Sequence, residues 1–289
     1  MQLRSQDTDF FSDMLTVAFR KGDSARVKSL YYSQPRKLTV DDYWLAIQAS
    51  CDTDFLGWII EIILSAEDVT WSQMKVIQIL TAEFTKSGEF MASVLQRTGG
   101  AASSDTIIAA IEGKNVEVFL AVWAVRRVGR KIQAAAWSKF LNKAILCTDV
   151  QVLAQILRDW PQGLAKPEDL SSYRFLVDYP ECLQLLLEKQ VPFTERSYQH
   201  ILLYVFSDYI KLKDQLARST MPIFQGRTIK SDIVQLINKA NVIVRILADH
   251  DIRPSEANLE YAVQSLPSGI SDKMTAICQQ QRGAAAPNR

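Results

Sequence analysis

The feature that most constrains the fold is a short polar break that recurs along the chain. Apolar residues follow the helical spacing i, i+3, i+4, i+7 on both sides of these breaks, as Met14, Val17 and Ala18 do before Gly22. The breaks are centred near residues 22, 52, 87, 114, 148, 179, 240 and 268. Successive intervals are 27 to 35 residues long, apart from one of 61. A regular interval of this size predicts helical pairs stacked in a solenoid.

Composition agrees with a helical chain. The 289 residues include only 11 glycines and 9 prolines, and 48% of them are hydrophobic. These values disfavour turn-rich β folds and supply a sizeable core. We therefore predict an all-α fold of about seven or eight helical pairs in a single domain over residues 1–278. The segment 207–230 is expected to be an insertion or a degenerate unit, with a loop at Met221–Gly226, and residues 279–289 a flexible tail.

Capping residues support several helix starts. Thr39, Ser103 and Ser255 stand where free N–H groups need acceptors, and Pro167-Glu168-Asp169 brings acids to another predicted first turn. Each of these residues has a structural explanation as a helix cap.

The clearest repeated sequence pattern lies in the second helix of each pair. ECLQLLLEK at 181–189 and VIVRILADH at 242–250 resemble the second helix of an ankyrin repeat, E-V-V-K-L-L-L-E-H-G-A. AAIEGK at 109–114 is similar to the A-A-x-x-G-H that joins the two helices in that family. The resemblance implies paired helices and a scaffold or adaptor role. Ankyrin-like proteins that pathogens deliver into host cells belong to the same family.

The departures from that family keep other repeat types open. The T-P-L-H turn would fall on Ser104–Ile107, where its proline and histidine are missing, and the helix-ending glycine is replaced by Gln190 and by Asp251. These replacements weaken the left-handed cap that glycine normally provides. Tetratricopeptide and HEAT-like stacks remain alternatives, although the interval is short for both.

The cysteines and histidines form no metal-binding or catalytic pattern, and the known catalytic motifs are absent from the sequence. The four cysteines are separated by 96, 35 and 96 positions, and there are only two histidines. No P-loop, dinucleotide-binding turn, nucleophile elbow or H-E-x-x-H helix is present, so we expect no metal, cofactor or catalytic residue. The polar N-terminus and the short apolar runs indicate neither a signal peptide nor a membrane span, and a cytoplasmic location is expected.

Charge is balanced overall but uneven along the chain. The formal net charge is +1, yet residues 38–74 hold seven acids and no base, and residues 118–148 hold six bases and no acid. One interpretation is that both runs are solvated faces. The alternative is a pair of docking patches, one for a basic and one for an acidic partner surface, or for head-to-tail self-association.

Candidate partner-binding residues fall in two places. The first is the basic cluster and its neighbouring tryptophans, and the second is the extended unit, where aromatic side chains would be presented by the loop. The candidates are Trp123, Arg126, Arg127, Arg130, Lys131, Trp137, Tyr209 and Phe224.

The function expected from these features is non-enzymatic protein binding by a scaffold or adaptor. The partner would be another protein of unknown identity, or a second copy of the chain, held by the concave face and turns of the solenoid. Two alternatives stay open. The first is an all-helical enzyme whose site is assembled only in three dimensions, and the second is a nucleic-acid or phosphate-binding module that uses residues 126–131.

Overall fold

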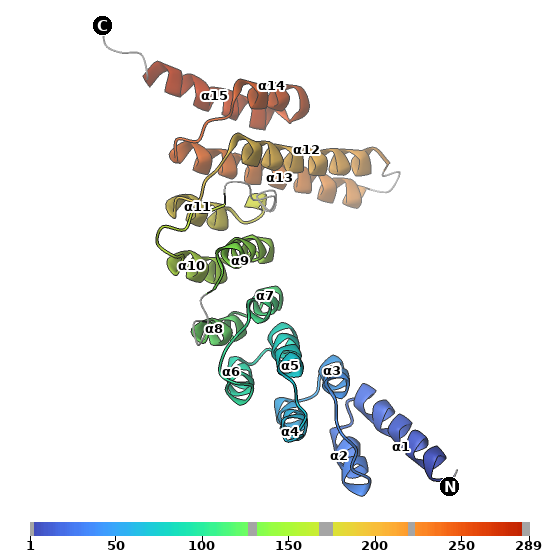
Figure 1. The fold of residues 1–289 in the computed structure, drawn as a ribbon. Helices are drawn as coiled ribbons and strands as arrows, with labels where there is room; N and C mark the ends of the chain where they lie inside the picture. Colours follow the sequence, from blue (N-terminus) through green and yellow to red (C-terminus); the bar gives the residue numbers. More distant parts are fainter. Residues whose placement is uncertain (1–2, 127–131, 168–175, 219–222, 285–289) are drawn as a thin grey trace. The chain divides into compact units, whose positions relative to one another are not determined.

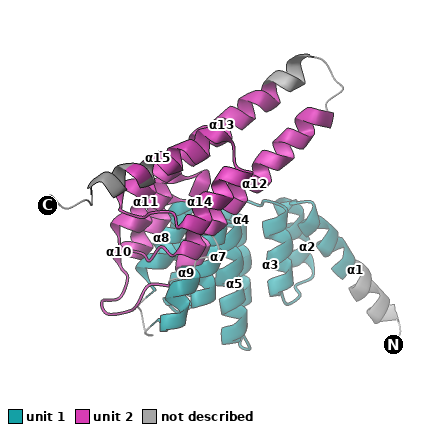
Figure 2. Ribbon diagram, turned by 90° about the horizontal axis from the view of Figure 1, so that it is seen from above, with its two compact units in different colours: residues 1–140 teal, residues 141–289 magenta. Residues whose placement is uncertain are grey.

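Every regular element in the described part of the chain is a helix, which confirms the all-α class. The computed structural model describes residues 3–126, 132–167, 176–218 and 223–284. The sequence led us to expect one domain over residues 1–278. Contacts within the structure divide the chain into two compact units, residues 1–140 and residues 141–289 (Figure 2).

The first unit contains eight complete helices of 9 to 18 residues. They are α1 (Leu3–Arg20), α2 (Ser24–Ser33), α3 (Val40–Gln48), α4 (Thr53–Leu64), α5 (Trp71–Phe84), α6 (Gly88–Arg97), α7 (Ser104–Glu112) and α8 (Val116–Ala124). A ninth helix, α9 (Ala134–Cys147), begins in this unit and ends in the second. The predicted breaks at 22, 52, 87 and 114 all fall between these helices and are confirmed.

The helices of the first unit pack in two rows (Figure 1). Helices α1, α3, α5 and α7 contact one another in succession, and α4, α6 and α8 do the same on the other side. Each odd helix also contacts the even helix that follows it. Every helix therefore buries one face between its neighbours and leaves another outside, which is how a 3.6-residue apolar stripe is satisfied.

The predicted caps are present at three of the four positions. Thr39 and Asp42 form a capping box at α3, and the Ser103 and Ser255 side chains accept hydrogen bonds from Thr106 N and Asn258 N. Residues 168 and 169 lie outside the described residues.

Most odd-numbered helices end in a left-handed residue. The residues are Gly22, Ser50, Lys114, Thr148, Gln190 and Asp251, with φ between 54° and 67°. Val191 N donates to Leu186 O at 2.9 Å, which is the 6→1 bond of a Schellman end. Gln190 and Asp251, which stand where the family has glycine, both adopt the left-handed conformation. Each non-glycine residue costs about 1 kcal/mol there.

Two glycines allow close approach between successive pairs of the first unit. A Cβ atom on Gly113 would lie 2.7 Å from Glu83 O, and one on Gly88 would lie 2.9 Å from Glu117 O. Both distances are far below van der Waals contact, so neither position accepts a side chain without movement of a backbone. The turn after α7 therefore packs directly on the end of α5.

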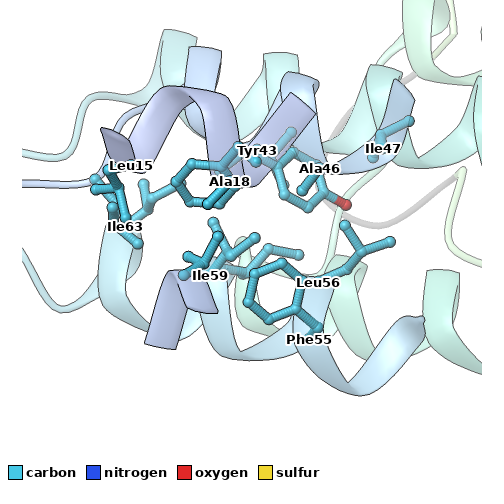
Figure 3. Close-up of a cluster of buried hydrophobic side chains, with 14 of the residues drawn as sticks. Leu15, Ala18, Tyr43, Ala46, Ile47, Phe55, Leu56, Ile59 and Ile63 are labelled. Carbon is cyan, nitrogen blue, oxygen red and sulfur yellow. The ribbon is translucent and has the colours of Figure 1, made fainter. Parts of the chain in front are cut away.

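The core of the first unit lies between the two rows (Figure 3). Tyr43 and Ala46 of α3 meet Phe55 and Ile59 of α4, all at most 1% exposed. The Tyr43 hydroxyl lies 2.7 Å from Thr81 Oγ1 on α5, which satisfies its only polar group. Burial raises the pKa of this phenol strongly, so the side chain stays neutral.

The second unit holds longer helices. They are α10 (Val150–Arg158), α11 (Pro180–Glu188), α12 (Glu195–Arg218), α13 (Ile223–Asp249), α14 (Glu256–Ser265) and α15 (Ser268–Ala284). Helices α12 and α13 lie side by side as a hairpin that projects beyond the shorter helices of the unit (Figure 1). The predicted breaks at 148, 179 and 268 are confirmed.

Two predictions for residues 207–250 were wrong. The break at 239–241 lies inside α13, because Lys-Ala-Asn contains no glycine or proline and its first two residues are good helix formers. The loop expected at Met221–Gly226 is helical from Ile223 onward, so Gly226 is tolerated within the helix. The extra length of this region is taken up by two long helices.

The flexible tail predicted at 279–289 was wrong for its first part, because α15 continues through Ala284. Glutamine, arginine and alanine favour helix, and a polar composition does not stop a helix that has already started. Residues 285–289 lie outside the described residues.

Candidate functional site

The structure buries Trp123 and Trp137, two of the residues that the sequence suggested as partner contacts. They are only 2% and 3% exposed, with ring centroids 5.6 Å apart in an edge-to-face pair. Phe119 and Phe140 complete an aromatic cluster around Trp123. Tryptophan supplies a large apolar area, and these two serve the core of the first unit.

Arg126 packs on this cluster. Its guanidinium lies 4.3 Å from the Trp123 ring centroid, and Nη1 donates to Trp123 O at 2.6 Å. The side chain thus satisfies a carbonyl at the end of α8, where positive charge is favourable. Arg127, Arg130 and Lys131 lie outside the described residues.

The two candidates in the extended unit lie on the α12–α13 hairpin. Tyr209 belongs to α12 and is half-buried. Phe224 belongs to α13, and its side chain lies outside the described residues. Both belong to the second unit, whereas the Trp123 cluster belongs to the first.

Several acids of residues 38–74 are paired with bases from outside that stretch. Asp42 is buried and accepts two hydrogen bonds from Arg36, at 2.5 and 2.9 Å. Lys37 pairs with Asp68, and its hydrogen bond lowers the pKa of that carboxyl. These contacts hold the start of α3 and the loop after α4, so part of the acidic run is structural.

Two other acids of this run, Asp54 and Glu61, border a groove on the outside of the first unit, which we call the α4–α6 groove. It has a volume of about 440 Å³. Its α4 side is Thr53, Asp54, Gly57, Trp58 and Glu61, and its α6 side is Glu89, Phe90, Ser93 and Arg97, with Ser87 at the end. The positions on each helix follow i, i+3/i+4 and i+7 spacing, so each side of the groove is one helix face.

An ion pair closes one end of the groove. Arg97 Nη1 lies 3.1 Å from Glu61 Oε1 and donates to Gly57 O at 3.4 Å. Gly57 lies close to this pair, since a Cβ atom there would lie 3.8 Å from Arg97 Nη1 and 3.8 Å from Phe90 Cε2, in ordinary van der Waals contact. The other end holds Asp54 and Glu89, both exposed and both in the first turn of their helix.

Aromatic side chains form the α4 edge of the groove. Trp58 stacks on Phe55 with ring centroids 5.5 Å apart and meets Tyr31 edge-on at 5.4 Å. Trp58 Nε1 donates to the hydroxyl of Tyr32, a residue that is 67% exposed. Lys28 Nζ lies 5.6 Å from the Trp58 ring centroid, within cation–π range. The cluster is fixed by packing and still presents an aromatic surface.

A second cavity of about 440 Å³ adjoins this groove, because Thr53 and Ser87 line both. Tyr43 and Thr81 lie in its wall, and Cys51, Asp52 and Lys86 lie around it. Burial raises the pKa of the Cys51 thiol, and the neighbouring Asp52 carboxylate adds to the shift. A thiol with a raised pKa is a poor nucleophile at neutral pH.

The second unit contains a polar cavity of about 290 Å³ between α12 and α13. Asp178 is its centre, since it accepts from Tyr204 at 3.1 Å and pairs with Lys239 at 2.7 Å. Burial and the nearby carboxylates raise the pKa of Tyr204, so this phenol is not a base near neutrality. These contacts tie the base of the hairpin to the turn before α11.

The sequence analysis did not single out Trp58 or Phe90. The available signal was that Trp58 shares a helix face with Asp54 and Glu61, which is unusual for a core position. No local sequence pattern predicts that α4 packs beside α6.

No family of proteins, no curated protein and no solved structure matches this chain. Among the described residues, no group of three histidines, cysteines or acids could hold a metal ion. No helix in the described ranges is long and apolar enough to cross a membrane.

Proposed function

We propose that the chain is a non-enzymatic scaffold or adaptor built as an α-solenoid. Its α4–α6 groove would bind a basic segment of a partner protein that carries a large apolar side chain. The observation that carries the proposal is the placement of Trp58 and Phe90 beside the exposed carboxylates of Asp54 and Glu89. Aromatic anchors with a charged rim are typical of protein-binding surfaces.

The solenoid part of the proposal is supported by the repeated geometry of the first unit. Alternate helices pack in two rows, and left-handed helix ends recur after α1, α3 and α7. Such units contact mainly their neighbours, which leaves the outer helix faces for partners. The α4–α6 groove lies on one of these outer faces.

Charge favours a basic partner. The groove and its adjoining cavity are lined by four acids against two bases, a net charge of −2; these residues are Asp52, Asp54, Glu61, Glu89, Lys86 and Arg97. The Glu61–Arg97 pair and the Asp52 cap occupy two of the acids. Asp54 and Glu89 are thus the carboxylates best placed to meet incoming lysine or arginine.

Peptide selection tests this proposal even though the partner is unidentified. A random peptide library displayed on phage would be panned on the purified chain, and selected peptides measured by isothermal titration. We expect lysine or arginine beside a large apolar residue. The Asp54→Lys, Glu89→Lys double variant should bind several-fold more weakly, by up to about 25-fold, since each exposed charge contact is worth up to about fivefold.

A matched control separates the groove from net charge. Asp41→Lys with Glu67→Lys changes the same number of charges, on exposed acids of the same acidic run that do not line the groove. This control should retain binding. Tyr32→Ser should weaken binding at little cost in stability, because that side chain is largely exposed. Equal affinity of the groove variant and the control for the selected peptides would refute the proposal.

A further inference from the structure

The α12–α13 hairpin of the second unit presents an amphipathic outer face on α12. Leu203, Ile210 and Ala217 are seven residues apart and therefore lie near one line along the helix. All three are exposed, Leu203 by 50% and Ile210 by 38%. Lys213 and Arg218 are exposed too, and helical geometry places them on either side of that line, with the exposed Asp214 close beside it.

This face is left open within its own unit. Helix α12 packs mainly on α13 and α14, and its far half extends with α13 beyond the other helices (Figure 2). A helix of 24 residues is about 36 Å long, whereas a neighbour of 10 residues such as α14 is about 15 Å long. The apolar face formed by Leu203, Ile210 and Ala217 is therefore not covered by any described residue of its own unit.

The hairpin and the α4–α6 groove have opposite charge. The described residues 207–218 and 228–239 of the hairpin hold five bases against three acids, a net charge of +2. They are Lys211, Lys213, Arg218, Lys230, Lys239, Asp208, Asp214 and Asp232. The groove with its adjoining cavity has a net charge of −2.

The apolar spacing also matches. The α4 wall of the groove from Thr53 to Glu61 spans eight residue steps, or about 12 Å, and Leu203 to Ile210 spans about 10 Å. With α12 antiparallel to α4, Leu203 and Ile210 reach the aromatic wall, while Lys213 comes to the end that holds Asp54 and Glu89. This orientation brings opposite helix-dipole ends together.

We infer that the α4–α6 groove of one copy receives the outer face of α12 from a second copy of this chain. The inference rests on the proposed function, since it names the basic, apolar segment that the groove takes. The two surfaces differ, so the contact is head-to-tail, and a pair of copies keeps one free hairpin on one copy and one free groove on the other. Association then depends on concentration and decreases with salt, because its rim is ionic.

Sedimentation velocity on the full chain, over a series of concentrations, tests this inference. The wild type should show a sedimentation coefficient that rises with concentration. The groove variant Asp54→Lys, Glu89→Lys and the hairpin variant Lys213→Glu, Arg218→Glu should each lower the association constant several-fold, by up to about 25-fold. The control Asp41→Lys, Glu67→Lys should associate like the wild type. Thermal melts verify that all variants fold.

Mixing the two charge-reversed variants gives the decisive result. The basic groove of one then faces the acidic hairpin of the other, so the equimolar mixture should regain association that neither variant shows alone. Failure to regain it, or association that survives both reversals, overturns the inference.

The same experiment separates this inference from the proposed function. A wild type that stays monomeric at every concentration overturns self-association, and selected peptides that still bind the groove would leave the proposed function standing. Loss of peptide binding, with charge-dependent association intact, would identify self-association as the only use of the groove.

Discussion

Gly57 is the floor of the α4–α6 groove, and replacing it with alanine should raise stability while lowering binding. Gly57 lies inside α4, where glycine is about 0.5 to 1 kcal/mol less favourable than alanine. The added Cβ would lie 3.8 Å from both Arg97 Nη1 and Phe90 Cε2, which is ordinary van der Waals contact. No clash offsets the gain, so the free energy of unfolding should rise by about 0.5 to 1 kcal/mol.

Gly113→Ala provides the opposite case. Its Cβ would lie 2.7 Å from Glu83 O and 2.8 Å from Ala82 O, both backbone atoms at the end of α5. Overpacking of this kind costs about 1 to 3 kcal/mol. The two Gly→Ala substitutions should therefore have opposite signs, although helix propensity alone gives no reason for a difference in sign.

Thermal unfolding by circular dichroism measures both effects. At about 2 to 4 °C per kcal/mol for a chain of this size, Gly57→Ala should raise Tm by about 1 to 4 °C, and Gly113→Ala should lower it by about 2 to 12 °C. Peptide titration should show weaker binding to Gly57→Ala, because the methyl group fills part of the groove. A lower Tm for Gly57→Ala, or unchanged binding, would refute the described groove floor.

Three further substitutions test the cap, the core and a buried thiol. Lys114→Gly should raise stability by about 1 kcal/mol in urea unfolding, since Lys114 has φ of 54°; no gain would contradict that conformation. Tyr43→Phe should lower it by about 1 kcal/mol through loss of the hydrogen bond with Thr81, and a neutral result would argue against that bond. Burial, followed by the Glu181 and Asp149 carboxylates, raises the pKa of Cys182 to about 11 from 9.0. The protonated thiol therefore favours the folded state below pH 9, and this contribution is lost between pH 9 and 11 as the unfolded thiol ionises. Cys182→Ala should show a shallower loss of stability across that window than the wild type, and parallel pH profiles would contradict the burial.

The local breaks were predictable from sequence where a specific residue type imposes them. Gly22, Gly88 and Gly113 stand at turns that the structure confirms, and the Asp52 side chain caps α4. The break at 239–241 was predicted from the short polar sequence Lys-Ala-Asn, which contains no glycine or proline, and the helix continues through it. A polar residue is weaker evidence for a break than a residue whose backbone preference opposes the helix.

The candidate site was less predictable because it depends on contacts between distant segments. Trp123 and Arg126 are close in sequence and suggested an exposed cluster, yet the ring is covered by Phe140 and Trp137 from α9. Trp58 is the opposite case: its surroundings on α4 are apolar, but the α6 face beside it is polar and leaves a groove. Sequence periodicity gives the side of a helix that is buried, whereas the neighbour that borders the other side is set by the tertiary packing.

Hydrogen bonds of one buried side chain fix the spacing of α5, α6 and α7, and α6 is one side of the groove. Gln78 on α5 is 1% exposed, and its Nε2 donates to Thr98 Oγ1 at 2.8 Å and to Ala101 O at 3.1 Å. Thr106 on α7 donates to Gln78 Oε1 at 3.3 Å. A buried amide whose bonds reach three segments loses them all if the segments slide, and each loss costs about 1 to 3 kcal/mol. The end of α6 is therefore anchored, and Arg97 just before Thr98 is held against Glu61 and Gly57. A groove fixed in this way loses little conformational entropy when a partner binds, so affinity depends on the side chains that line it.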